Sequence, residues 1–91
     1  MLERKPRKAT TLVTFVLPAE HPTGPVSVVG DFNGWQPGAH PLVERADGNR
    51  AVTVTLSTKD RVAFRYLAHG DYWFNDEHAD AVEGGNGVLF T

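Results

Sequence analysis

Strict alternation of apolar and polar residues marks two stretches of the chain. Apolar side chains occupy every second position, first at Val52, Val54 and Leu56 and then at Val62, Phe64 and Tyr66. A period of two is typical of a β-strand with one buried face. If Phe64 and Tyr66 point into a core, Arg65 between them must point out.

Shorter apolar runs, separated by turn residues, predict the remaining strands. They lie at residues 10–17, 26–29, 42–45, 72–74 and 88–90. Gly, Pro, Asn and Asp cluster between them, and no segment repeats apolar residues with a helical period. The pattern predicts an all-β fold, an immunoglobulin-like antiparallel β-sandwich of about seven strands. We expect Val28, Val52, Val54, Phe64 and Tyr66 inside it.

Composition narrows the class of protein. A chain of 91 residues makes one small domain, and the absence of cysteine excludes disulfides and thiolate metal sites. No stretch has the apolar length of a membrane span, and the N-terminus lacks the apolar core of a signal peptide. A cytoplasmic location is therefore expected.

Charge is distributed unevenly. Four of the nine Lys and Arg residues fall within the first eight positions, and five acids with no Lys or Arg lie between Asp71 and Glu83. A basic segment can contact nucleic acid or an anionic membrane. Because residues 1–8 contain Pro6 and little apolar surface, we interpret them instead as a disordered leader. Removal of this leader should leave folding unchanged, and residues 9–91 are expected to form the domain. Neither nucleic acid nor a membrane is an expected partner.

The segment from Val26 to Trp35 carries the most information. A β-branched run stops at Gly30, and Asp31, Asn33 and Gly34 supply turn chemistry directly before Trp35. A large ring after a tight turn lies near the edge of a sheet. There it either stacks on the C–H-rich face of a sugar or closes the core, and spacing alone does not separate these interpretations.

The full set of motifs resembles a known family. It comprises Gly-Asp-Phe-Asn-Gly-Trp at 30–35, Phe-Arg-Tyr at 64–66, a Gly turn followed by Trp73 and Asn75-Asp76, and Asn86 before the last strand. From about Val26 to Phe90 the chain is similar to the glycogen-binding modules, which are family-48 carbohydrate-binding modules also called isoamylase N-terminal domains, with an early-set immunoglobulin-like fold. Such modules precede the catalytic barrel of branching and debranching enzymes and occur in the β subunit of AMP-activated protein kinase.

The resemblance implies roles for particular residues. It makes Trp35 a sugar-stacking platform and Arg65 a donor of hydrogen bonds to glucose hydroxyls. A second platform falls on Trp73, with Tyr72 as the substitute because the preceding turn is one residue longer here. Asn86 corresponds to a sugar-binding asparagine.

Other interpretations stay open for some of these residues. Residues 82–84, Val-Glu-Gly, depart from the family pattern, which has a hydrophobic residue and a threonine in this region. Arg65 can instead pair with Asp71 or Asp76 on the surface, and Asn86 can cap the bend before the last strand. The acidic stretch from Asp76 to Asp80 is expected to be an exposed loop without a metal, because its spacing matches no known ligand motif.

The expected function is therefore binding without catalysis. The resemblance implies a module for α-1,4-linked glucan such as glycogen or starch, with a glucan-metabolising enzyme as a further partner and no cofactor. The sequence contains no nucleophile elbow and no phosphate loop, so we do not expect an enzyme. The alternatives are a regulatory protein–protein interaction domain, because aromatic residues with Arg also suit a protein interface, and the accessory domain of a larger glycoside hydrolase or branching enzyme.

Overall fold

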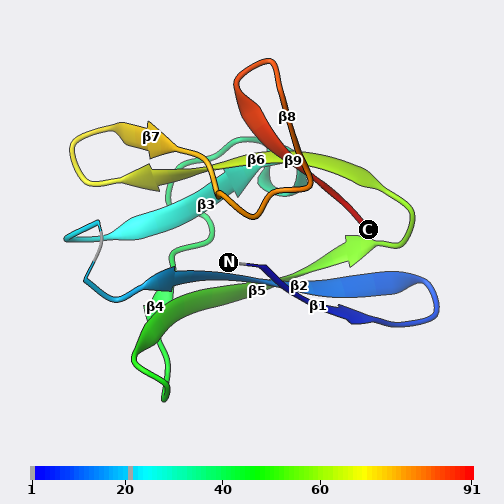
Figure 1. The fold of residues 1–91 in the computed structure, drawn as a ribbon, viewed down its shortest axis with the longest axis horizontal. Coiled ribbons are helices and arrows are strands. Elements are labelled where there is room, and N and C mark those ends of the chain that lie inside the picture. Colours follow the sequence, from blue (N-terminus) through cyan, green and yellow to red (C-terminus); the bar gives the residue numbers. More distant parts are fainter. Residues whose placement is uncertain (1, 21) are drawn as a thin grey trace.

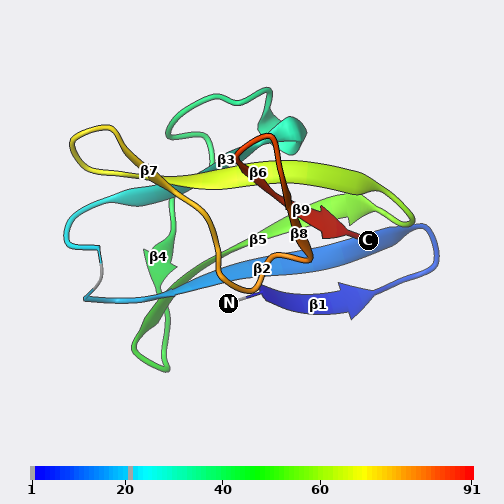
Figure 2. The same ribbon diagram turned by 45° about the horizontal axis from the view of Figure 1, so that its top comes forward.

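Two antiparallel sheets pack face to face in a computed structural model that describes residues 2–20 and 22–91. One sheet has the strand order β1-β2-β5-β4, and the other has the order β3-β6-β9-β8 with β7 paired to β6. Figures 1 and 2 show β3, β6 and β7 in one layer and β1, β2 and β5 in the other. The strands are β1 (Leu2–Pro6), β2 (Thr10–Pro18), β3 (Val26–Gly30), β4 (Val43–Glu44), β5 (Asn49–Ser57), β6 (Arg61–Ala68), β7 (Tyr72–Phe74), β8 (Ala81–Glu83) and β9 (Asn86–Phe90).

The β-sandwich predicted from the sequence is confirmed, with two strands more than expected. The additional strands within the described residues are β1 and β8. A single turn of 3-10 helix, η1 (Asp31–Asn33), follows β3. Within the described residues, no helix has the length and apolar character needed to cross a membrane.

The core lies between the two sheets and has the register that alternation predicts. Val28, Val54, Phe64 and Tyr66 are buried, whereas Val52 is partly buried and packs against the edge of this core. Phe15 of β2 is the centre of an aromatic cluster. Its ring contacts the rings of Phe32, Phe64 and Tyr66 at centroid distances of 5.7, 5.1 and 6.4 Å.

Strand β1 replaces the disordered leader expected for residues 1–8, so this expectation is wrong for the described residues 2–6. Leu2 to Pro6 pair with Phe15 to Thr11 of β2, and the Arg4 guanidinium donates to both carboxylate oxygens of Asp80, at 2.9 and 3.0 Å. An edge strand needs backbone pairing on one side only, and charged residues and proline are common in such strands. Met1 lies outside the described residues.

Asp76 differs from the exposed acid expected at this position. Its side chain is only 1% exposed, and the Tyr66 hydroxyl donates a hydrogen bond of 2.6 Å to its Oδ2. Burial by itself would raise the pKa of Asp76, but the bonds from Tyr66 and from the backbone amide of His78 outweigh it and lower the pKa. Asp76 therefore fixes the segment that follows β7 to the core strand β6.

Candidate functional site

The candidate site lies on the outer face of the β3-β6-β9-β8 sheet, where β6 changes its partner. Residues Arg61 to Phe64 of β6 pair with β9, and Tyr66 to Ala68 pair with β7. Arg65 stands between these two ladders. Because side chains of a strand alternate between faces, Arg65 shares the outer face with Leu67, whose partner in β7 is Trp73.

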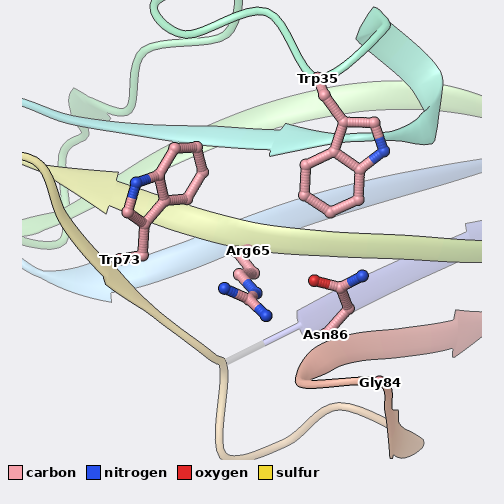
Figure 3. Close-up of a pocket in the computed structure, with 5 residues that line it drawn as sticks. All are labelled: Trp35, Arg65, Trp73, Gly84 and Asn86. Atoms are coloured by element: carbon pink, nitrogen blue, oxygen red, sulfur yellow. The ribbon is translucent and has the colours of Figure 1, made fainter.

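An open depression of about 360 Å³ occupies this face. It is lined by Trp35, Arg65, Trp73, Gly84 and Asn86. Figure 3 shows the two indoles on either side of Arg65, with their six-membered rings turned toward each other. The structure thus brings together four of the five residues that the sequence singled out for sugar binding.

The first wall of the depression is the segment from Gly30 to Trp35, here called the Trp35 corner. Gly30 has no room for a side chain, because a Cβ would lie 2.5 Å from the carbonyl oxygen of Ala63. Asn33 accepts a hydrogen bond from the Gly30 amide at 3.1 Å and donates to the carbonyl of Val28 at 3.1 Å. Gly34 ends η1 in the left-handed conformation, with φ 65°.

Trp35 is held at the end of this corner and is not a core residue. It is half-buried and lies outside the core cluster. Its backbone is left-handed, with φ 59°, which costs a bulky residue about 1–3 kcal/mol. Two hydrogen bonds hold this conformation, from the backbone amide to the Gly30 carbonyl and from the indole Nε1 to Asp31 Oδ1, each 3.0 Å long.

Arg65 supplies the floor of the depression and is not engaged by the rest of the protein. Among residues 2–20 and 22–91, its guanidinium has no acidic partner and no hydrogen-bond acceptor, and its Nε is buried. Ion pairs with Asp71 or Asp76 are thus not formed. The guanidinium lies against the β8–β9 turn, since a Cβ on Gly85 would be 2.7 Å from Nη2. The guanidinium therefore keeps donors that the protein does not use, and acceptor oxygens of a ligand could bond to those that reach the depression.

The second wall is β7 together with Asn75, here called the Trp73 strand. The Trp73 side chain is 39% exposed, and within the described part of the chain its indole N–H has no acceptor. Asn75 donates from Nδ2 to the Gly85 carbonyl at 3.1 Å and so ties this strand to the β8–β9 turn. Asn86 leaves that bend uncapped and instead lines the depression. Sequence reasoning missed this role of Asn75, whose polar side chain directly after a short strand was the available signal.

Tyr72 lies apart from the depression, so the structure does not support it as the substitute for Trp73. Neighbouring residues of a strand face opposite ways, and Tyr72 stacks on Phe74 with ring centroids 5.4 Å apart. Its side chain is nevertheless 58% exposed. Tyr72 is therefore an exposed aromatic residue outside the site.

The residues around the depression carry little charge. Arg65 is the one ionisable residue that lines it, and no three His, Asp or Glu side chains gather as a metal site anywhere in the described residues. The depression therefore offers two aromatic faces, a planar cation and an amide. This chemistry suits a neutral ligand with C–H-rich faces and hydroxyl groups.

Comparison of the sequence with protein-family models gives no match, and no curated protein matches it significantly.

Proposed function

We propose that this domain is a non-catalytic module that binds an α-1,4-linked glucan in the depression between Trp35 and Trp73. The observation that carries the proposal is the convergence of Trp35, Arg65, Trp73 and Asn86 on one open depression. These residues come from four different segments of the chain, spread over positions 35 to 86. The resemblance to glycogen-binding modules had selected these four residues, together with Tyr72 as the substitute for Trp73.

The chemistry of the depression supports a sugar ligand. Pyranose rings have flat C–H faces that stack on aromatic rings, and each aromatic contact contributes roughly 0.5–1.5 kcal/mol beyond its buried area. The unengaged Arg65 guanidinium can donate to two adjacent hydroxyls, and the Asn86 amide can both donate and accept. A shallow site of this kind should bind an oligosaccharide with a Kd on the order of 10–1000 μM. A polymer would be retained more tightly because many sites on it are available.

The lining also supports binding over hydrolysis. Glycoside hydrolysis requires two carboxyl groups placed on either side of the scissile bond. Trp35, Arg65, Trp73, Gly84 and Asn86 include no carboxylate. A catalytic function would therefore have to come from another part of a larger protein.

Affinity electrophoresis in gels containing glycogen, with titration calorimetry against maltoheptaose, tests the proposal. We expect Trp35→Ala to weaken binding at least about fivefold, because the loss of one stacking face corresponds to roughly 1 kcal/mol or more. Arg65→Ala should also weaken it, and Arg65→Lys should restore binding only in part because a single point donor replaces a planar fork.

Tyr72→Ala is the matched control, since it removes an exposed aromatic ring that lies outside the depression. Circular dichroism must show that each variant is folded. If wild-type protein is not retarded by glycogen, or if folded Trp35→Ala and Trp73→Ala both migrate as wild type does, glucan binding is contradicted. A protein-interaction domain then becomes the better interpretation, since the same aromatic and Arg side chains suit a protein partner.

A further inference from the structure

The carboxylate of Asp31 joins the Trp35 ring to the strand that carries Arg65. Its Oδ1 accepts a hydrogen bond from the Trp35 indole at 3.0 Å. Its Oδ2 accepts one from the backbone amide of Ala63 in β6 at 2.9 Å. Both oxygens are thus used within the protein, and they point to different parts of the candidate site.

The Asp31 carboxylate accepts a hydrogen bond from β6 directly beyond the end of the backbone ladder between β3 and β6. The ladder between β3 and β6 stops at the pair Gly30–Phe64. Asp31 follows Gly30 directly, so its side chain supplies the acceptor for the next β6 amide, that of Ala63. Ala63 is two residues before Arg65 and lies on the same face of β6. Through Asp31, the Trp35 ring is therefore held in place relative to β6, the strand that carries Arg65.

The bond to Asp31 also determines which edge of the indole meets a ligand. An indole has one hydrogen-bond donor, its Nε1–H. In Trp35 this donor is turned toward Asp31, and Figure 3 shows the six-membered ring turned toward the depression. Trp35 thus presents ring face and C–H edge with no donor, whereas the indole N–H of Trp73 is unpaired within the described residues.

We propose that Asp31 is a positioning residue, which holds the Trp35 ring in its binding orientation relative to Arg65 before any ligand arrives. This inference rests on the proposed glucan site for its functional consequence. The orientation itself is a property of the free protein. A ring fixed in advance loses less conformational freedom on binding than one that must be ordered by the ligand.

Hydrogen exchange of the two indole N–H groups, followed by NMR in the free protein, tests the orientation without any ligand. We expect the Trp35 indole proton to exchange at least about tenfold more slowly than that of Trp73, because one is bonded to a carboxylate and the other has no acceptor among the described residues. Asp31→Ala should remove this protection. Asp31→Asn should reduce it, because an amide has one acceptor oxygen for two donors.

A double-mutant cycle with maltoheptaose tests the consequence for binding. Asp31→Asn should weaken binding roughly threefold to tenfold in the wild-type background. The loss should largely disappear in Trp35→Phe, which keeps a ring but has no N–H to position, and should persist in full in Trp73→Phe. A general structural defect would act equally in both backgrounds, and circular dichroism checks that every variant is folded.

The outcomes separate this inference from the proposed function. Equal exchange of the two indole protons, or exchange at Trp35 that Asp31→Ala leaves unchanged, overturns the positioning role whether or not glucan binds. An equal effect of Asp31→Asn in both backgrounds overturns it as well. Protection at Trp35 that depends on Asp31, in a protein that does not bind maltoheptaose, supports the positioning role and contradicts the glucan site.

Discussion

The two walls of the depression each present a tryptophan but are built in different ways. In the Trp35 corner, side-chain and backbone hydrogen bonds fix the turn, and the indole donor itself is bonded to Asp31. In the Trp73 strand, three residues pair with β6 on one side, and the side chain of Asn75 supplies the tie to the neighbouring turn. The Trp35 indole is thus held by a hydrogen bond of its own, whereas the Trp73 indole has no such bond within the described residues.

This difference has a thermodynamic consequence. The Trp35 corner carries backbone strain at Trp35, which the surrounding hydrogen bonds must offset in the free protein. In return its ring needs no further ordering when a ligand stacks on it. The Trp73 side chain has no such hydrogen bond within the described residues, so more of its side-chain freedom would be lost when a ligand stacks on it. Substitutions in the Trp35 corner should therefore affect stability most, whereas those in the Trp73 strand should affect mainly affinity.

The largest effect is expected from Gly30→Ala. A Cβ at this position would meet the Ala63 carbonyl and the Phe64 Cβ at 2.5 and 2.9 Å, so the corner would have to move away from β6. We expect a loss of about 3 kcal/mol in the free energy of unfolding, measured by urea denaturation. Gly34→Ala is the control, because only its left-handed φ opposes a side chain there, and it should cost about 1 kcal/mol. Equal losses in the two variants would show that the close approach at Gly30 is not what holds the corner.

Tyr66→Phe should have the next largest effect, and it acts on the anchor of the other wall. It removes the hydrogen bond to the buried Asp76 carboxylate, so we expect a loss of about 2 kcal/mol at neutral pH. The pKa of Asp76 is lowered in the folded protein, so the unfolded chain binds more protons once the pH falls below about 5. The stability that this group contributes is present at neutral pH and is lost as the pH falls through and below about 4. Denaturation curves between pH 7 and 2 should show this loss in wild type and a shallower one in Tyr66→Phe.

Deletion of residues 2–8 should have the third largest effect. It should lower stability without changing the affinity for a glucan. Strand β1 belongs to the sheet opposite the depression, but it joins β2 along its length and bonds to Asp80. We expect a fall in Tm of roughly 5–10 °C. Affinity for maltoheptaose at a temperature where both proteins are folded should not change. A change in affinity would mean that the sheet with β1 also influences the position of the two walls, so that their difference would not arise from local contacts alone.

The smallest effect is expected from exchanging tryptophan for phenylalanine at each wall. Trp35→Phe loses stacking area and the bond to Asp31, so it should lower affinity for maltoheptaose more than Trp73→Phe, by a factor of about three. It should also lower stability, by about 1 kcal/mol, whereas Trp73→Phe should leave stability nearly unchanged. Calorimetry and urea denaturation of the two variants measure both quantities. A reversed order would mean that the Trp73 strand is the better ordered wall.

The register of the central strand could be predicted from the sequence because it depends on local alternation. Val62, Phe64 and Tyr66 had to share a face, which placed Arg65 on the other. Strand β1 could not be predicted in this way. Its pairing partner lies elsewhere in the chain, and four of its five residues are exposed, so no apolar face marks it as a strand. Asp76 was misread for a related reason, since the Tyr66 hydroxyl that bonds to it comes from another strand.

The details of the Trp35 corner were also beyond sequence reasoning. The turn residues before Trp35 were visible, but a left-handed tryptophan is uncommon, and its cost is accepted only because Gly30 and Asp31 provide acceptors. The choice between Tyr72 and Trp73 depended on one residue of register in a short strand. The pairing of Trp73 with Leu67 places Trp73, and not Tyr72, on the face with the depression.

The chain has two tryptophans, and each stands on a different wall. Replacing either one with phenylalanine leaves a single tryptophan, which can be excited selectively over the two tyrosines and reports the wall on which it remains. Emission and collisional quenching of Trp35 would follow the Trp35 corner, and those of Trp73 would follow the Trp73 strand, without any attached label. The order in which the two walls respond to a ligand, to acid or to heat can therefore be measured directly by tryptophan fluorescence.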